Sequence, residues 1–282
     1  MKFTKLQGLG NDFLIIYVDD VNRLEKPEEL AKQMCERNYG AGADGIVFVA
    51  QIHSEEADFA SRIFNADGSE AEISGNGTRC VAAYLYYKEL CQEPEIRILT
   101  AAGVKIGRFV GREGRHFDFE FDMGQPRLLS NEIPIALDKP LDRVVKYPLV
   151  MGGDVQEITC TSMGNPHCSL FVPSLEGLRI DELGPLLEDH PAFPMRTNVE
   201  FVHVISRQEI EVLFWERGVG RTLSSGTGSC GASIASMLNG YTDRNVRVNT
   251  PGGILQVVWQ DDNSIKLTGS AEVIYEGVWL RE

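Results

Sequence analysis

The sequence contains neither a long apolar stretch nor a run of basic residues. Its apolar runs are far shorter than the roughly 20 residues of a membrane-spanning helix, so no membrane association is expected. No apolar leader follows Met1, which predicts a cytoplasmic protein. Lys and Arg number 27 against 41 Asp and Glu, giving a formal net charge of −14. This charge argues against a nucleic-acid partner, which binds through neutralisation of phosphates by basic side chains.

The six cysteines include no Cys-x-x-Cys pair. The nearest candidate for a zinc site is Cys160, His167 and Cys168, but these residues lie on strand-like segments. Buried core thiols are therefore favoured over a metal site, and disulfides are not expected without a secretory signal. A length of 282 residues, with 43% hydrophobic and 24% charged residues, suits a globular protein of two domains.

Strand patterns dominate, and four segments have helical periodicity. Residues 14–18 form a continuous apolar run typical of a buried strand, and residues 117–121 alternate phenylalanine with charge, as in a half-buried strand. Pro27 begins a helix that is predicted to end near Gly40, and another helix is predicted over 176–189. The inward-facing residues of the second of these helices are predicted to be Leu183, Leu186 and Leu187.

The most informative feature is an internal repeat. Four landmarks recur in the same order about 150 positions later. They are GNDF at 10–13 and GNPH at 164–167, FN at 64–65 and WE at 215–216, SGNGT at 74–78 and SGTGS at 225–229, and TAAG at 100–103 and TPGG at 250–253. Each half is therefore predicted to be one copy of a single α/β unit, with the equivalent loops meeting across a pseudo-twofold axis.

The two S-G-x-G-[ST] loops come directly before helical patterns. Their glycines permit a tight turn with exposed backbone N–H groups, and a helix N-terminus adds partial positive charge. Two such anion sites facing one another across a cleft would hold one carboxylate, flanked by Ser74 and Ser225. The alternative for each serine alone is a plain N-cap, which serine often provides. The repeat favours the functional interpretation.

Two other motifs are excluded by their context. GAGADG at 40–45 fits G-x-G-x-x-G, but it follows a helix and precedes none, so a dinucleotide site is not expected. Neither Ser74 nor Ser225 lies in G-x-S-x-G, so a hydrolase nucleophile elbow is not supported.

Four segments resemble the signature motifs of the diaminopimelate epimerases, which belong to the cofactor-independent amino-acid racemases and epimerases. They are GLGNDF (8–13), NADGSEAEISGNGTRC (65–80), GNPH (164–167) and ERGVGRTLSSGTGSC (216–230). The resemblance implies an α/β (α+β) fold of two pseudo-symmetric domains, each a curved mixed sheet around a central helix, with the active site in the inter-domain cleft. We expect the domains at 1–122 and 123–270, with the final strand, 271–282, packing back against the first domain.

The resemblance also implies a reaction and a set of roles. Family members are cytoplasmic homodimers that interconvert LL- and meso-diaminopimelate for lysine and peptidoglycan biosynthesis, without pyridoxal phosphate or metal. His167 and Glu216 match groups that tune the catalytic thiols, Arg217 matches the partner of the distal carboxylate, and Tyr275 matches a dimer-interface residue. The remaining positions that match substrate-binding residues are Asn11, Asn65, Gly75, Asn76, Asn165, Asn198, Gly226 and Thr227.

The chain departs from the family pattern at its catalytic positions. Ser74 and Ser225 align with the two cysteines that exchange the α-proton on opposite faces of the substrate, whereas Cys80 and Cys230 lie inside helices. A thiol has a pKa near 8.5 and a hydroxyl one closer to that of water, so the deficit is roughly 8–10 kcal/mol. We therefore expect a site that binds substrate but scarcely epimerises it. Gly45 is a further departure, because some members carry a substrate-contacting glutamine there.

Two explanations of the serines remain open at this point. They are either engineered to trap substrate, or natural in a diverged relative. Such a relative would be an isomerase of another amino acid or a non-catalytic amino-acid-binding protein.

Overall fold

The computed structural model describes residues 1–72 and 74–280, and the chain divides into two units. Unit 1 is Met1–Asp122 with Thr268–Glu282, and unit 2 is Met123–Leu267. The second boundary falls within the last strand, β17 (Ile265–Val278). Residues 281–282 of the segment predicted to pack back lie outside the described part of the chain.

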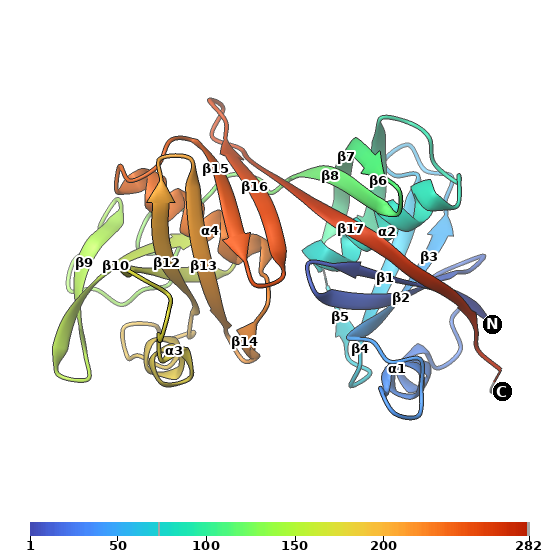
Figure 1. Ribbon diagram of the computed structural model, residues 1–282, viewed down its shortest axis with the longest axis horizontal. Helices are drawn as coiled ribbons and strands as arrows, with labels where there is room; N and C mark the ends of the chain where they lie inside the picture. Colours follow the sequence, from blue (N-terminus) through green and yellow to red (C-terminus); the bar gives the residue numbers. More distant parts are fainter. Residues whose placement is uncertain (73, 281–282) are drawn as a thin grey trace. The chain divides into compact units, whose positions relative to one another are not determined.

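Unit 1 is a mixed sheet wrapped around a helix. Its elements besides β17 are β1 (Lys2–Gly8), β2 (Asn11–Tyr17), α1 (Pro27–Cys35), β3 (Gly45–Gln51), β4 (Phe59–Asn65), β5 (Glu70–Ala71), α2 (Gly75–Tyr87), β6 (Glu95–Thr100), β7 (Gly103–Glu113) and β8 (His116–Asp122). The pairing runs β17–β1–β2–β3–β4–β6–β7–β8, and β8 also pairs with β17, which closes the strands into a ring. Helix α2 packs against β1, β2, β3 and β8, inside this ring (Figure 1).

Unit 2 repeats this arrangement. Its elements are β9 (Val144–Met151), β10 (Asp154–Ser162), β11 (Pro166–Phe171), α3 (Ile180–Glu188), β12 (Asn198–Ser206), β13 (Glu209–Glu216), β14 (Gly220–Thr222), α4 (Gly226–Leu238), β15 (Asn245–Thr250) and β16 (Gly253–Trp259). The pairing runs β9–β10–β11–β12–β13–β15–β16, with α4 packed against β10, β11, β12 and β16. The parallel pairs are β11–β12 and β13–β15, and they correspond to β2–β3 and β4–β6 of unit 1.

The strand register makes the two units comparable residue by residue. Phe13 lies opposite Gly45 in β2–β3, and His167 lies opposite Asn198 in β11–β12. The predicted fold, two related mixed sheets each around a central helix, is therefore confirmed. Each unit also has an apolar core of its own, which includes Phe48 and Met34 in unit 1 and Phe201 and Leu187 in unit 2.

Most predicted elements are present, with three corrections at the outer helices. Helix α1 ends at Cys35 rather than near Gly40, because the backbone of Glu36 turns to φ −58° and ψ 125°. The helix predicted over 176–189 begins only at Ile180; Gly177 has φ +72°, which a right-handed helix does not allow.

The third correction concerns the inward face of α3. Leu187 is buried, but Leu186 is 51% exposed. A helix of nine residues buries only one face, and here that face carries Ile180, Gly184 and Leu187 at helical spacing.

The remaining expectations can be compared directly. Residues 14–18 fall in β2 except for the last, residues 117–121 fall in β8, and four α-helices are present among the described residues. GAGADG at 40–45 leads from α1 into β3, so no helix follows it. No helix in the described ranges is long and apolar enough to cross a membrane.

Candidate functional site

The first glycine loop forms the N-terminus of α2. Ser74 has extended backbone angles, φ −134° and ψ 120°, and its Oγ accepts a hydrogen bond from the Gly77 N–H at 3.0 Å. Next to it, the buried Arg79 guanidinium donates to Oδ1 of Asn76 and, at 3.4 Å, to the carbonyl of Ser270. The loop therefore combines an exposed first helical residue, Gly75, with a buried asparagine whose amide is oriented by a buried cation.

The second glycine loop forms the N-terminus of α4 with the same backbone geometry. Ser225 has φ −134° and ψ 125°, and its Oγ accepts from the Gly228 N–H at 3.2 Å. In addition, the Ser225 hydroxyl donates to Oε2 of Glu216 at 3.0 Å, and Thr222 donates to the other carboxylate oxygen at 2.7 Å. Both serines are thus N-caps, and Ser225 also has a carboxylate as a hydrogen-bond acceptor.

The motif asparagines of unit 1 lie beside charged or polar partners. Asn11 donates from Nδ2 to Oδ2 of Asp44 at 2.6 Å. Asp44 and Asp12 accept each other's backbone N–H groups at 3.0 Å, and Lys5 and Arg37 pair with these carboxylates. Burial would raise the pKa of Asp12, but hydrogen bonds from Arg37 and Lys5 outweigh it and hold that pKa below its usual value.

The other unit 1 asparagine is more open. Asn65, at the end of β4, is exposed and donates to Oγ of Ser69 at 2.9 Å. The structure therefore brings Asn11 together with a carboxylate, and Asn65 with a surface hydroxyl.

The asparagines of unit 2 contact other predicted site residues. Asn165 donates from Nδ2 to Oγ1 of Thr227 at 3.3 Å, which joins the GNPH loop to the α4 N-terminus. Asn198 accepts the backbone N–H of Arg217 at 3.0 Å and donates to the carbonyl of Pro166 at 2.9 Å. The Arg217 guanidinium, which is partly exposed, donates to the carbonyl of Met195 at 2.9 Å.

His167 is fully buried, and both of its ring nitrogens have partners. Nδ1 lies 2.6 Å from Oε1 of Glu200, and Nε2 lies 3.0 Å from Oδ1 of Asn165. Ser169 donates to the second oxygen of Glu200 at 3.3 Å. Burial raises the pKa of the Glu200 carboxyl, and His167 opposes that rise.

The residues of this network that sequence reasoning did not single out include Asp44, Arg79 and Glu200. Only Glu200 left a signal in its own segment. It is an acidic residue between the apolar Val199 and Phe201 in β12, and a charged side chain is rarely buried without a partner.

Two further positions from the sequence analysis are Tyr275 and Gly45. The Tyr275 hydroxyl donates to the carbonyl of Ala41 at 3.3 Å, and its ring packs edge-on against Phe3. Gly45 begins β3, where a Cβ atom would come within 2.8 Å of the Phe64 carbonyl oxygen. A side chain at this position would therefore require the backbone to move.

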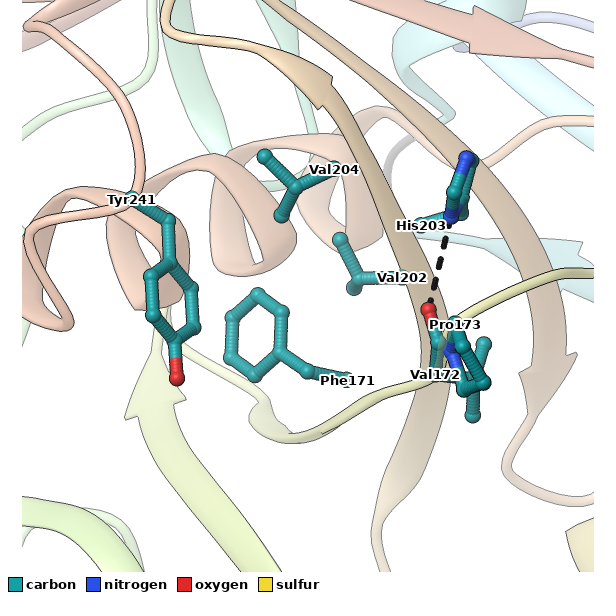
Figure 2. A pocket seen from close by; sticks show the side chains of 7 residues that line it. All are labelled: Phe171, Val172, Pro173, Val202, His203, Val204 and Tyr241. Carbon is teal, nitrogen blue, oxygen red and sulfur yellow. Dashed lines mark hydrogen bonds between the residues drawn. The ribbon is translucent and has the colours of Figure 1, made fainter.

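A cavity of about 340 Å³ in unit 2 contains none of the predicted site residues (Figure 2). Phe171, Val202 and Tyr241 form much of its apolar lining, and His203 lies 3.4 Å from the carbonyl of Val172. The described residues contain no group of three or more His, Cys, Asp or Glu side chains arranged to hold a metal ion. Cys160 and Cys168 lie opposite each other on β10 and β11, both buried and free.

Comparison with known proteins agrees with this arrangement. The family model for diaminopimelate epimerase matches residues 3–129 and 159–274. A curated diaminopimelate epimerase of Pelotomaculum thermopropionicum is 47% identical over 279 residues, covering 98% of both chains. One from Microcystis aeruginosa is 44% identical over 285 residues, again covering 98% of both.

Solved structures show the same fold at lower identity. A PhzF-family phenazine biosynthesis protein of Bacillus anthracis aligns with a TM-score of 0.69 and 17% identity, covering 100% of this chain and 99% of that one. A probable proline racemase of Agrobacterium radiobacter aligns with a TM-score of 0.67 and 17% identity, covering 99% and 93%. With the family model and the curated relatives matching nearly the whole chain, the protein belongs to the diaminopimelate epimerase family of isomerases.

Proposed function

We propose that this chain binds diaminopimelate, or a similar dicarboxylic amino acid, and is built to interconvert the LL- and meso- forms by proton transfer between two faces of the α-carbon. One observation carries the proposal. Ser74 and Ser225 occupy matching N-cap positions at the first turns of α2 and α4. A carboxylate held by the N–H groups of both helix N-termini would leave its α-carbon between the two hydroxyls.

The other end of the substrate has its own candidates in unit 2. A guanidinium is suited to bidentate pairing with a distal carboxylate, and Arg217 is partly exposed. Its backbone is held by Asn198. Asn11, Asn65 and Asn165 are the further proposed contacts for the ammonium and carboxylate groups.

Ser74 and Ser225 also limit the rate of catalysis that we expect. In a two-base reaction, one group takes the α-proton from one face while the other donates a proton to the opposite face. Ser74 and Ser225 supply hydroxyls where the family resemblance implies thiols. The deficit in acidity amounts to roughly 8–10 kcal/mol, so we expect binding with little epimerisation.

The test restores both thiols. The Ser74→Cys/Ser225→Cys form should epimerise diaminopimelate several orders of magnitude faster than the parent chain. The rate is measured by deuterium incorporation at the α-carbon and by separation of the stereoisomers. General acid–base catalysis needs geometry first and pKa second, and the loops supply the geometry. A restored form that binds diaminopimelate without exchanging or inverting it would instead favour an isomerase of another amino acid, or an amino-acid-binding protein without catalysis.

We further propose a cytoplasmic homodimer acting in lysine and peptidoglycan precursor synthesis, with Tyr275 at the dimer interface. Tyr275 is 40% exposed, which leaves part of its ring available to a second copy. Sedimentation should give twice the monomer mass of 31.3 kDa, and Tyr275→Glu should shift it toward the monomer. A monomeric parent chain would contradict this part of the proposal.

A further inference from the structure

The GNPH loop of unit 2 is connected to a carboxylate buried in the sheet. A chain of contacts leads from Glu200 to Nδ1 of His167, from Nε2 of His167 to Oδ1 of Asn165, and from Nδ2 of Asn165 to Thr227. Its inner end is closed to solvent, because His167 is 0% and Glu200 is 1% exposed. Its outer end, Thr227, lies in the first turn of α4.

The hydrogen-bond partners determine how many protons the His167 ring and the Glu200 carboxyl hold between them. Oδ1 of Asn165 can only accept, so Nε2 of His167 carries a hydrogen. One further proton then lies between Nδ1 and Oε1 of Glu200, 2.6 Å apart, whichever atom holds it. An isolated buried carboxylate would be strongly destabilising, whereas a pair that shares a proton and is hydrogen-bonded is tolerated.

Unit 1 shows that the fold itself does not require this pair. By strand register, the counterpart of His167 is Phe13 and the counterpart of Glu200 is Val47. Both are buried apolar residues. The matching asparagine, Asn11, is oriented directly by Asp44. A carboxylate thus orients the motif asparagine in each unit, directly in unit 1 and through a histidine in unit 2.

We infer that Glu200 is a positioning residue that fixes the His167 ring and thereby the amide of Asn165. With Oδ1 occupied by His167, the amide N–H groups of Asn165 point toward Thr227 and the α4 N-terminus, where they add a donor to the anion site. The inference rests on the proposed function in one respect, namely that Asn165 and Thr227 contact the ligand. The orientation of His167 and Asn165 does not depend on it.

The test combines nitrogen-15 NMR of the histidine rings with calorimetry of diaminopimelate binding. Of the 5 histidines, His167 is assigned by the loss of its signals in His167→Phe. In the parent chain we expect a proton at Nε2 and a strongly hydrogen-bonded proton at Nδ1. Glu200→Gln should alter the Nδ1 signal and weaken diaminopimelate binding about 10-fold, as for the loss of one oriented hydrogen bond to a charged group.

Two variants separate positioning from stability. Ser169→Ala removes the other side-chain contact of Glu200 but keeps its contact with His167, so it should retain the proton at Nε2, the hydrogen-bonded proton at Nδ1 and the affinity for diaminopimelate. His167→Phe/Glu200→Val installs the apolar pair of unit 1. It should fold, because replacement of a buried ionic pair by apolar residues is often neutral, yet bind about 10-fold more weakly.

The outcomes are distinct. Unchanged His167 signals in Glu200→Gln, or full affinity in the folded double variant, would overturn the inference. A parent chain that binds no diaminopimelate would overturn the proposed function, while the NMR comparison would still decide whether Glu200 orients His167. If Glu200→Gln fails to fold, the affinity for diaminopimelate is compared between the parent chain and His167→Phe/Glu200→Val instead.

Discussion

Ser74 and Ser225 begin equivalent helices with the same φ, −134°, and with ψ values of 120° and 125°. Their side-chain surroundings are not equivalent. Ser225 donates to the carboxylate of Glu216, whereas Ser74 donates to no carboxylate in the described part of the chain. The residue that corresponds to Glu216 is Asn65, and it contacts Ser69 instead. The duplicated backbone therefore supplies two matching capped helix N-termini, while individual side chains make the two loops chemically different.

The largest expected effect is that of Glu216 on α-proton exchange, which should differ between the two stereoisomers. In the Ser74→Cys/Ser225→Cys background, Glu216→Gln should slow α-proton exchange by about 10²–10⁴-fold for one stereoisomer only, the one whose α-proton is taken by the residue at position 225. Deuterium exchange of LL- and meso-diaminopimelate, measured separately, tests this. Glu211→Gln, an exposed carboxylate on the same strand, is the matched control. An equal loss for both stereoisomers would show that Glu216 does not distinguish the two faces.

The next effect concerns the distal end of the substrate. Arg217 in unit 2 corresponds to Ala66 in unit 1, so only unit 2 offers a guanidinium at this position. Arg217→Met should weaken diaminopimelate binding by about 2–5 kcal/mol, as when one partner of a buried charge pair is removed. Calorimetry measures the affinity, with the exposed Arg221→Met as control. Equal affinity of parent and variant would place the distal carboxylate elsewhere.

A smaller effect is an opposite pH dependence of stability in the two units. The lowered pKa of Asp12 gives stability that is present above its unfolded value, about 3.9, and is lost as pH falls through the folded value. The pKa of Glu200 is raised by burial, so its contribution is present below about 4.3 and is lost as pH rises through the folded value. Asp12→Asn should therefore reduce the loss of unfolding free energy as the pH falls below about 3.9. Glu200→Gln should reduce the loss of unfolding free energy as the pH rises above about 4.3.

Denaturant unfolding across pH tests this prediction. The groups facing Glu200 besides His167 include Glu216 on β13 and Cys168 on β11, so both variants are compared with Glu216→Gln. Curves that change in the same direction in both variants would contradict the comparison.

The smallest effect tests the shared capping role. Ser74→Ala should destabilise the protein by about 1 kcal/mol, the usual cost of losing an N-cap. Ser225→Ala should cost somewhat more, because Glu216 also loses a hydrogen-bond donor. Thermal unfolding of both variants provides the measurement. A larger loss for Ser74→Ala would reverse this ranking.

Several features of the fold were predictable because they depend on local sequence. The N-caps join residues only three positions apart, Ser74 to Gly77 and Ser225 to Gly228. The motif S-G-x-G contains both residues at that spacing. The repeat of this motif predicted two copies of one unit, and the mixed sheets around α2 and α4 agree with it. Helix ends were less predictable; α3 begins only after the left-handed Gly177.

The sequence by itself determined the family, the repeat and the two capped helix N-termini, which we propose as anion sites. It also identified Asn11, Asn165 and His167 as residues of interest, but it did not show what orients them. That was decided by tertiary structure, because Asp44 and Glu200 are each 33 positions from the residue they hold, Asn11 and His167 respectively. Strand register brings them together: β11 and β12 align in parallel only after α3 has crossed between them, and no local pattern encodes which side chains then meet.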